Sequence, residues 1–356
     1  VPNDKHPTDL YSSMSSAFSA ASMVFKDSDL SFSEKLKSKT ESLFLLAMNS
    51  PKDSLKNVFP ELSLNYDYSE GIYDELFEAG LMLDKTNQDI TNRDANLHYY
   101  STYNFDTISG KSWKNRRLSI NFLLFESTGD SYYLKVIENY IQSWIKAEKS
   151  SEFGPPQKSK LSNLHQFTMT MFHALILNKI SGNHVFYEDW VRDSMHFILG
   201  KNIEEKSLIV GYSSNFMENV RHKASSCPSP PATCNSLDET KLANNPNHVI
   251  GAIVNGIEEP GFISDSRSNF SNGIRLISNA PISGILLRLF ELYGNLANVN
   301  SNLFPDPQDC SDAASDYPST FTLNLDLYIL YKDDLEPSPF PSSNSGLVSD
   351  PPSDPN

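Results

Sequence analysis

The sequence predicts an all-α fold with a small β appendage near its C-terminal end. Apolar residues recur at helical spacing through about the first 290 residues. A period-two alternation appears only near residues 321–331, and the final stretch, 336–356, is rich in proline, serine and aspartate. We therefore expect a helical domain over residues 1–296, a β-containing appendage over 297–335 and a flexible linker over 336–356.

The first two expected helices are defined by apolar spacing and by a capping signal. The buried face of the first helix is predicted from the stripe Met14, Ala17, Phe18, Ala21, Val24 and Phe25. Ser31 and Glu34 have the spacing of a capping box, which predicts that the second helix begins there and continues to Ala47.

Further stripes predict helices over residues 72–83, 133–145, 164–175 and 190–199. Gly200 is placed to end the last of these. A final helix is expected to begin near Pro281 and to reach Gly294, because proline favours the first helical position. The long spacer over residues 201–280 predicts irregular loops, where binding and catalytic residues are usually found.

Charge and hydropathy exclude several functional classes. The 356 residues include 29 lysines and arginines and 44 acidic residues, so the net charge is 29 − 44 = −15. Such a surface disfavours nucleic acid and anionic membranes as partners. No apolar run approaches the roughly 20 residues of a membrane span, so we expect no membrane insertion, and no signal peptide is visible. Because the chain begins with Val1, we expect a processed product or part of a longer protein.

Cysteine usage and one sequon suggest an extracellular protein. Cys227 and Cys234 flank a proline-rich loop, where they would form either a local disulfide or two unpaired thiols. Three cysteines are too few for a disulfide scaffold and lack zinc-site spacing. Asn269 begins an Asn-Phe-Ser sequon and is the expected glycosylation site. We identify no cofactor motif and no metal-binding cluster, and we expect a secreted protein.

A series of motifs in a fixed order resembles glycoside hydrolase family 9, the endoglucanase or cellulase family. The resemblance covers about residues 10–293 and looks eukaryotic in the Cys227–Cys234 loop. It implies an (α/α)6 toroid and inverting hydrolysis of β-1,4-glucan. The motifs are ASMVFKDSD (21–29), SEGIYDEL (69–76), STGDSYY (127–133), VRHKASSCP (220–228), NPNHVIGAIVNG (245–256), DSRSNF (265–270) and NAPISG (279–284).

The carboxyl groups that inverting hydrolysis requires are missing from the matching positions. The family takes its general base from an N-terminal DAGD motif, which this chain lacks because it matches the family from a point well downstream. The family's general-acid position falls on Gly273 or Ile274, and neither can donate a proton. The resemblance therefore implies a toroid that lacks its first part and has lost its catalytic carboxylates.

The sugar-binding residues are partly retained. The family's HHR motif is Arg221, His222 and Lys223 here, and an ammonium does not reproduce the bidentate fork of a guanidinium. Asp265 and Arg267 remain from the DDR motif. We expect these five residues to contact a saccharide. The alternatives are a structural role for His222 and an ion pair of Asp265 with Arg267 that orders the loop.

Three tryptophans and one acidic pair complete the candidate set. Trp113 lies outside every apolar stripe and is the expected stacking residue for a sugar ring, whereas Trp144 and Trp190 are expected in the core. Asp74 and Glu75 resemble a catalytic carboxylate pair, but the motif places them at a helix start, where acidic groups favour the helix dipole.

Three functions remain open. The chain is expected to be a non-catalytic structural or glycan-binding module in an extracellular assembly, with a β-glucan or another glycan as ligand. The alternatives are an active inverting endo-β-1,4-glucanase completed by an upstream segment, and a protein–protein scaffold that uses the strand near 321–331. A toroid without its first helices would expose apolar faces, so we expect an upstream segment or another chain to cover them.

Overall fold

The computed structural model describes residues 6–51, 53–59, 72–100, 103–105, 108, 115–148, 164–181, 184–202, 204–228, 231–234, 244–256 and 263–293. The expected β appendage, the linker and Trp113 lie outside these residues. The chain divides into two units, Val1–Asp316 and Tyr317–Asn356, and everything below concerns the first.

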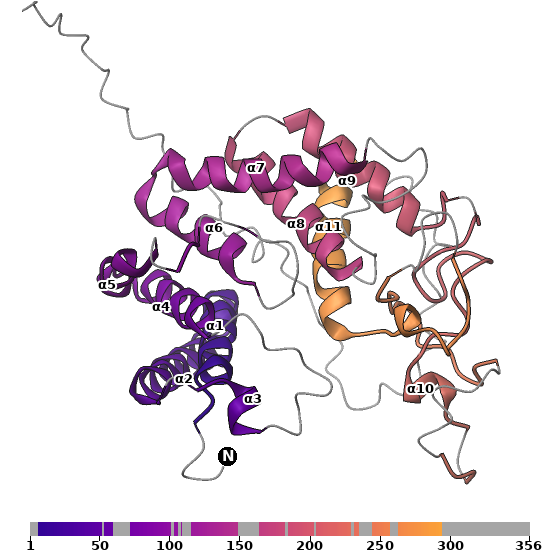
Figure 1. Ribbon diagram of the computed structural model, residues 1–356, viewed down its shortest axis with the longest axis horizontal. Coiled ribbons are helices and arrows are strands. Elements are labelled where there is room, and N and C mark those ends of the chain that lie inside the picture. Colours follow the sequence, from indigo (N-terminus) through magenta and orange to yellow (C-terminus); the bar gives the residue numbers. More distant parts are fainter. Residues whose placement is uncertain are drawn as a thin grey trace, which may run out of the picture. The chain divides into compact units, whose positions relative to one another are not determined.

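The described part is helical, and its remaining backbone pairing is confined to isolated β-bridges. The helices (Figure 1) are α1 (Thr8–Phe25), α2 (Leu30–Asn49), α3 (Leu55–Val58), α4 (Tyr73–Asn87), α5 (Thr91–Tyr100), α6 (Arg117–Thr128), α7 (Ser131–Glu148), α8 (Leu164–Ser181), α9 (His184–Ile198), α10 (Lys223–Ser226) and α11 (Leu276–Tyr293). The 3₁₀ turn η2 (Phe270–Asn272) precedes α11.

The predicted buried face of α1 is wrong. None of the six apolar stripe residues is fully buried, and Met14 is 38% exposed. The helix instead packs on α2 and α4 through small polar residues, among them Ser12, Ser15, Ser19 and Ser22. Ser12 and Ser22 donate to carbonyls within the helix, and Ser15 Oγ donates to the Thr40 carbonyl of α2 at 3.0 Å, whereas Ser19 Oγ has no partner among the described residues. Small side chains allow this close approach, and the hydrogen bonds offset the burial of polar atoms.

Two predicted helix starts are also wrong. The N-cap of α2 is Asp29, whose side chain accepts a hydrogen bond from the Phe32 amide at 2.9 Å, so Ser31 lies inside the helix. An aspartate two residues earlier in the sequence is an equally good cap. Helix α11 begins at Leu276 and contains Pro281 beyond its first turn, so the Ile277 carbonyl lacks its intrahelical partner.

Other predictions are confirmed. Gly200 follows α9 with φ 118°, and the Gly200 and Lys201 amides donate to the carbonyls of Phe197 and His196. This is the Schellman arrangement that ends many helices. Trp144 and Trp190 are buried, at 3% and 8% exposure. Both belong to the largest apolar cluster, which α7, α8, α9 and α11 form with the loops after α9.

Helices α8 and α11 lie side by side (Figure 1). Gly284 of α11 faces Phe172 of α8 so closely that a Cβ atom there would lie 2.5 Å from the ring. The first residues of α8 hold the loops, since the Leu164 amide donates to the Asn255 carbonyl at 2.7 Å. Among the described residues, no helix has the length and apolar composition of a membrane span.

Candidate functional site

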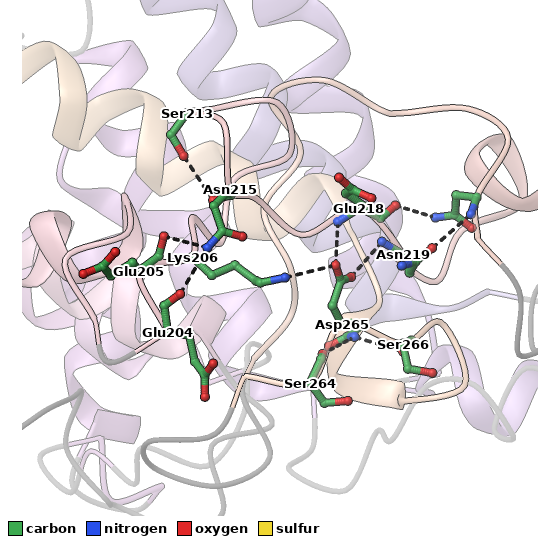
Figure 2. A network of polar contacts seen from close by, with 12 residues as sticks. Glu204, Glu205, Lys206, Ser213, Asn215, Glu218, Asn219, Ser264, Asp265 and Ser266 are labelled. Atoms are coloured by element: carbon green, nitrogen blue, oxygen red, sulfur yellow. Dashed lines mark hydrogen bonds and ion pairs between the residues drawn. The ribbon is translucent and has the colours of Figure 1, made fainter.

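The loops after α9 are held together by a network of polar contacts around Asp265 (Figure 2). Its carboxylate accepts hydrogen bonds from the amides of Glu218 and Asn219 at 3.1 and 2.8 Å, and it forms an ion pair with Lys206 Nζ at 3.3 Å. Asp265 thus forms its ion pair with Lys206. Together with the two amide contacts, this ion pair joins three loop segments. This geometry favours the structural role for Asp265.

Arg267 supports the same loops from a buried position. It is 4% exposed, and its Nη1 donates to Asn245 Oδ1 at 3.0 Å. The Asn245 amide in turn donates to the carbonyls of Glu218 and Val220. Arg267 therefore acts through Asn245 on the segment that leads into Arg221.

The three residues of the altered HHR motif have different surroundings. His222 is exposed, and its Nδ1 accepts the Ala224 amide hydrogen at 3.1 Å, so it caps the short helix α10. Lys223 is exposed. Arg221 is half-buried, and its guanidinium lies over the Phe270 ring, 5.7 Å from the centroid. Cys227, at the end of α10, forms a disulfide with Cys234 across a Cα separation of 5.2 Å.

The expected general-acid position lies beside this motif. The Arg221 amide donates to the Asn272 carbonyl, and Arg221 and Gly273 form a β-bridge. Ile274 forms a second bridge with Val254, and the Asn255 amide donates to the Gly273 carbonyl at 2.7 Å. The structure therefore brings Gly273 and Ile274 next to Arg221, with no carboxyl group at either position.

Asn269 lies in the same loop. It is half-buried, and its amide Nδ2 donates to Ser264 Oγ at 2.8 Å. A glycan on this nitrogen would replace that hydrogen bond. Glycosylation of Asn269 stays a prediction.

A cavity of about 220 Å³ lies between α4, α6, α7 and α8. Its lining combines polar groups with aromatic and apolar surface, the mixture typical of small-molecule sites. The polar lining residues are Glu78, Asn115, Arg116, Ser119, Tyr140, His165, Gln166, Thr170 and His173. It is connected to the loops through α8, because His165 Nδ1 lies 3.1 Å from the Ile277 carbonyl at the start of α11.

Two neutral histidines contribute hydrogen-bond acceptors to this cavity. Burial lowers the pKa of both His165 and His173 to about 4. Nδ1 of each lies next to a carbonyl oxygen, that of Ile277 for His165 and that of Met169 for His173, so Nδ1 must carry the proton. The Nε2 atom of each ring is therefore left as an acceptor. Pro281 makes the first contact possible, since it has no amide hydrogen to offer Ile277, four residues earlier.

Hydrogen-bond donors come from Gln166 and Arg116. Gln166 Nε2 is buried and has no hydrogen-bond partner among the described residues. Arg116 Nε lies 3.6 Å from Glu78 Oε2, and Ser119 donates to the other oxygen of Glu78. The cavity thus offers donors and acceptors side by side, which suits a ligand whose hydroxyl groups act as both.

An acidic cluster lies behind the cavity at the start of α4. Asp74 and Glu75 occupy the first helical turn, as the sequence predicted, and both are buried. Asp74 accepts the Arg116 amide hydrogen at 3.1 Å. Burial raises the pKa of Glu75 to about 10, and neighbouring Asp74 adds to the rise. Glu75 is therefore protonated at neutral pH, so its burial adds no negative charge to the acidic cluster.

Sequence reasoning missed Glu78, Arg116 and the polar residues of α8. A signal for the latter was present: His165, Gln166, Met169, Thr170 and His173 recur at the spacing of one helical face. The apolar stripe of this helix marks only its opposite, core-facing side. Among the described residues, no three His, Cys, Asp or Glu side chains are grouped so as to hold a metal ion.

Comparison with known proteins extends this description. A family model described as glycosyl hydrolase family 9 matches residues 1–286. Endoglucanase 1 of Persea americana is 29% identical over 321 residues, which cover 78% of this chain and 63% of the relative. Endoglucanase 1 of Arabidopsis thaliana is 26% identical, with 81% and 64% covered. The chain thus spans less than two thirds of the length of these relatives.

Solved structures agree on the fold. The endoglucanase of the termite Nasutitermes takasagoensis has a TM-score of 0.73 at 23% identity, covering 80% of this chain and 66% of that one. The cellulase Cel9M of C. cellulolyticum, solved in complex with cellobiose, has a TM-score of 0.67 at 18% identity, with 82% and 66% covered. These neighbours have the (α/α)6 fold, which confirms the expected fold class. With its matched residues, its motif order and its helical architecture in agreement, the chain belongs to glycosyl hydrolase family 9.

Proposed function

We propose that this chain is a cellulase-like domain that has lost its catalytic carboxylates and serves as an extracellular module that binds β-1,4-glucan. The observation that carries the proposal is the occupant of the general-acid position. Gly273 and Ile274 have no carboxyl group, and both are tied into β-bridges beside Arg221. An inverting glycosidase requires an acid and a base on opposite faces of the sugar.

Nearby carboxyl groups are poor substitutes for the missing acid. The protonated Glu75 is buried and does not line the cavity. Glu78, at the cavity wall, is paired with Arg116 and accepts a hydrogen bond from Ser119. Asp265 is occupied by Lys206 and two backbone amides. Both carboxylates are thus already engaged by other groups of the chain.

The cavity supports a neutral saccharide as ligand. His165 and His173 supply acceptors, and Gln166 and Arg116 supply donors. Cel9M, a structural neighbour, was solved with cellobiose, which makes a cello-oligosaccharide the first ligand to test. The disulfide between Cys227 and Cys234 supports an oxidising, extracellular compartment.

The proposal also includes a partner for the exposed apolar surface of α2. Leu45 and Met48, one turn apart on α2, are 60% and 48% exposed. We expect an upstream segment or another chain to cover this face, and a strictly monomeric isolated chain would count against it.

Calorimetric titration with cellotetraose tests the binding role. The Gln166→Leu variant keeps the size of the side chain but removes the unpartnered donor, so we expect affinity to fall about tenfold. Gln142→Leu is the matched control, because Gln142 lies on α7 outside the cavity lining and donates to Tyr187. Equal affinity of the two variants would remove the cavity from the proposal, and no binding by the unaltered protein would refute it.

A further inference from the structure

The polar face of α8 extends along the cavity over two helical turns. His165 and His173 both line the cavity, and they are 173 − 165 = 8 residues apart on this helix. Their backbone positions are therefore separated by about 12 Å along the helix axis. Gln166, Met169 and Thr170 lie between them in the sequence and line the same cavity. The lining of the cavity is thus longer than a single sugar ring.

Contacts with α6 confirm that the two histidines lie at different levels of the cavity. Burial lowers the pKa of His165, and the charge of Arg116 adds to the decrease, which places Arg116 near this ring. Arg116 directly precedes α6. The ring of Phe122, further along α6, stacks on His173 with 5.4 Å between the centroids and 29° between the planes. Helix α6 therefore approaches α8 near His165 and again near His173.

The cavity is narrow as well as long. Its volume of about 220 Å³ lies below the roughly 300–1,000 Å³ of pockets that hold drug-sized ligands. Because this volume is spread over two helical turns, it suits a thin ligand better than a bulky one. Leu118 of α6 and Met169 of α8 supply apolar lining against which the C–H groups of a sugar can pack. A β-1,4-linked disaccharide, whose two rings lie end to end, has this elongated shape.

Each level of the cavity offers hydrogen-bonding atoms that the described part of the chain leaves free. At the first level, His165 Nε2 is an acceptor and the buried Gln166 Nε2 is a donor, and neither atom has a hydrogen-bond partner among the described residues. At the second level, His173 Nδ1 donates to the Met169 carbonyl at 2.7 Å, so its Nε2 is left as an acceptor. Sugar hydroxyl groups both donate and accept hydrogen bonds, so each level can bind one sugar unit.

We infer that the cavity binds a β-1,4-linked disaccharide unit aligned with α8, with one sugar ring at His165 and Gln166 and the other at His173. This inference rests on the proposed glycan-binding function and specifies the length and orientation of its ligand. A single sugar binds at the first level, because that level offers both a donor and an acceptor. His173 is then the residue that determines the preference for a disaccharide over a single sugar.

Calorimetric titrations with glucose, cellobiose, cellotriose and cellotetraose test the length of the site. We expect cellobiose to bind about tenfold more tightly than glucose, because it adds the hydrogen bond to His173 and the contacts of a second ring. Cellotriose and cellotetraose should bind within about threefold of cellobiose, since their further units lie outside the cavity. Glucose binding as tight as that of cellobiose, or a further rise of more than about threefold for each added unit, would overturn the inference.

Two variants assign the second level. His173→Phe keeps a ring that can stack on Phe122 but removes the acceptor, so the affinity for cellobiose should fall about tenfold while that for glucose stays unchanged. The unchanged glucose affinity also shows that the variant is folded. His196→Phe makes the same change at an exposed histidine of α9 outside the cavity lining and should alter neither affinity.

The outcomes separate this inference from the proposed function. A folded His173→Phe protein that loses affinity for both sugars equally, or for neither, would overturn the inference, whereas cellotetraose binding by the unaltered protein would leave the proposed function standing. If His173→Phe does not fold, the series of ligand lengths decides. If none of the four sugars binds, both proposals fail.

Discussion

His165 and His173 show how burial determines the chemistry of individual residues in the cavity. For each, the folded pKa of about 4 lies below the ordinary value of 6.5, so the unfolded chain binds more protons between these values. The stabilising contribution is fully present above pH 6.5 and is lost as the pH falls toward 4. The same neutrality leaves each Nε2 as an acceptor for a hydroxyl group.

We therefore predict that the free energy of unfolding falls between pH 6.5 and pH 5. His165 alone should account for roughly 1.5 kcal/mol of this decrease, given its pKa shift. Urea unfolding of the intact chain at the two pH values measures it. Glu75 acts in the opposite sense in this window, because the folded chain keeps its proton and the unfolded chain does not, so the total change is smaller than the sum of the two histidine contributions.

The His165→Gln variant tests whether His165 causes this pH dependence of stability. Glutamine can still donate to the Ile277 carbonyl but does not titrate. The stability of the variant should depend less steeply on pH than that of the unaltered protein. His248→Gln, a change at an exposed loop histidine, should leave the slope as it was. Identical slopes for all three proteins would mean that His165 is not held neutral by the fold.

At the scale of the helix, periodicity predicted where helices occur but not always which face is buried. In α1 the apolar stripe and the serine stripe have the same period, and packing on α2 and α4 selected the serines. That choice depends on hydroxyl hydrogen bonds to a neighbouring helix, such as Ser33 Oγ to the Ser22 carbonyl at 2.6 Å, which one segment's sequence does not reveal. The start of α11 was misplaced because proline favours the first helical position, whereas Pro281 lies in the second turn.

The close contact between α8 and α11 gives a prediction at this scale. Gly284→Ala would push a methyl group into the Phe172 ring, which also lines the cavity. Overpacking costs about 1–3 kcal/mol, and alanine returns about 1 kcal/mol of helix propensity. We expect a net loss of about 1 kcal/mol in thermal or urea unfolding.

Two further variants separate packing from other effects. Phe172→Leu introduced into Gly284→Ala should recover part of the lost stability, because the smaller side chain makes room for the methyl group. Ser283→Ala, on the exposed side of the same helix, should stay within about 0.5 kcal/mol of the unaltered protein. A Gly284→Ala protein as stable as the original would show that the two helices are not packed this closely.

At the scale of the whole chain, the order of motifs predicted the family and the fold, whereas the cavity was not predicted. The loop motifs follow one another in a fixed order along the sequence. VRHKASSCP and DSRSNF could therefore be matched to the family without knowing where their side chains lie. The cavity is assembled from four helices distant in sequence, and only their packing places Arg116 beside Glu78 and the α8 histidines. The structural roles of Asp265 and Arg267 likewise depend on contacts with Lys206 and Asn245.

The central claim is that this family 9 domain binds β-1,4-glucan without cleaving it. One measurement tests it most directly: reducing ends released from cellotetraose and from soluble β-1,4-glucan, assayed between pH 4 and pH 8 on samples whose binding is measured in parallel by calorimetry. We predict binding with no release above that of a protein-free control. Release of reducing ends by the purified chain would show that a carboxyl group other than one at position 273 or 274 acts as the acid, and would contradict the claim.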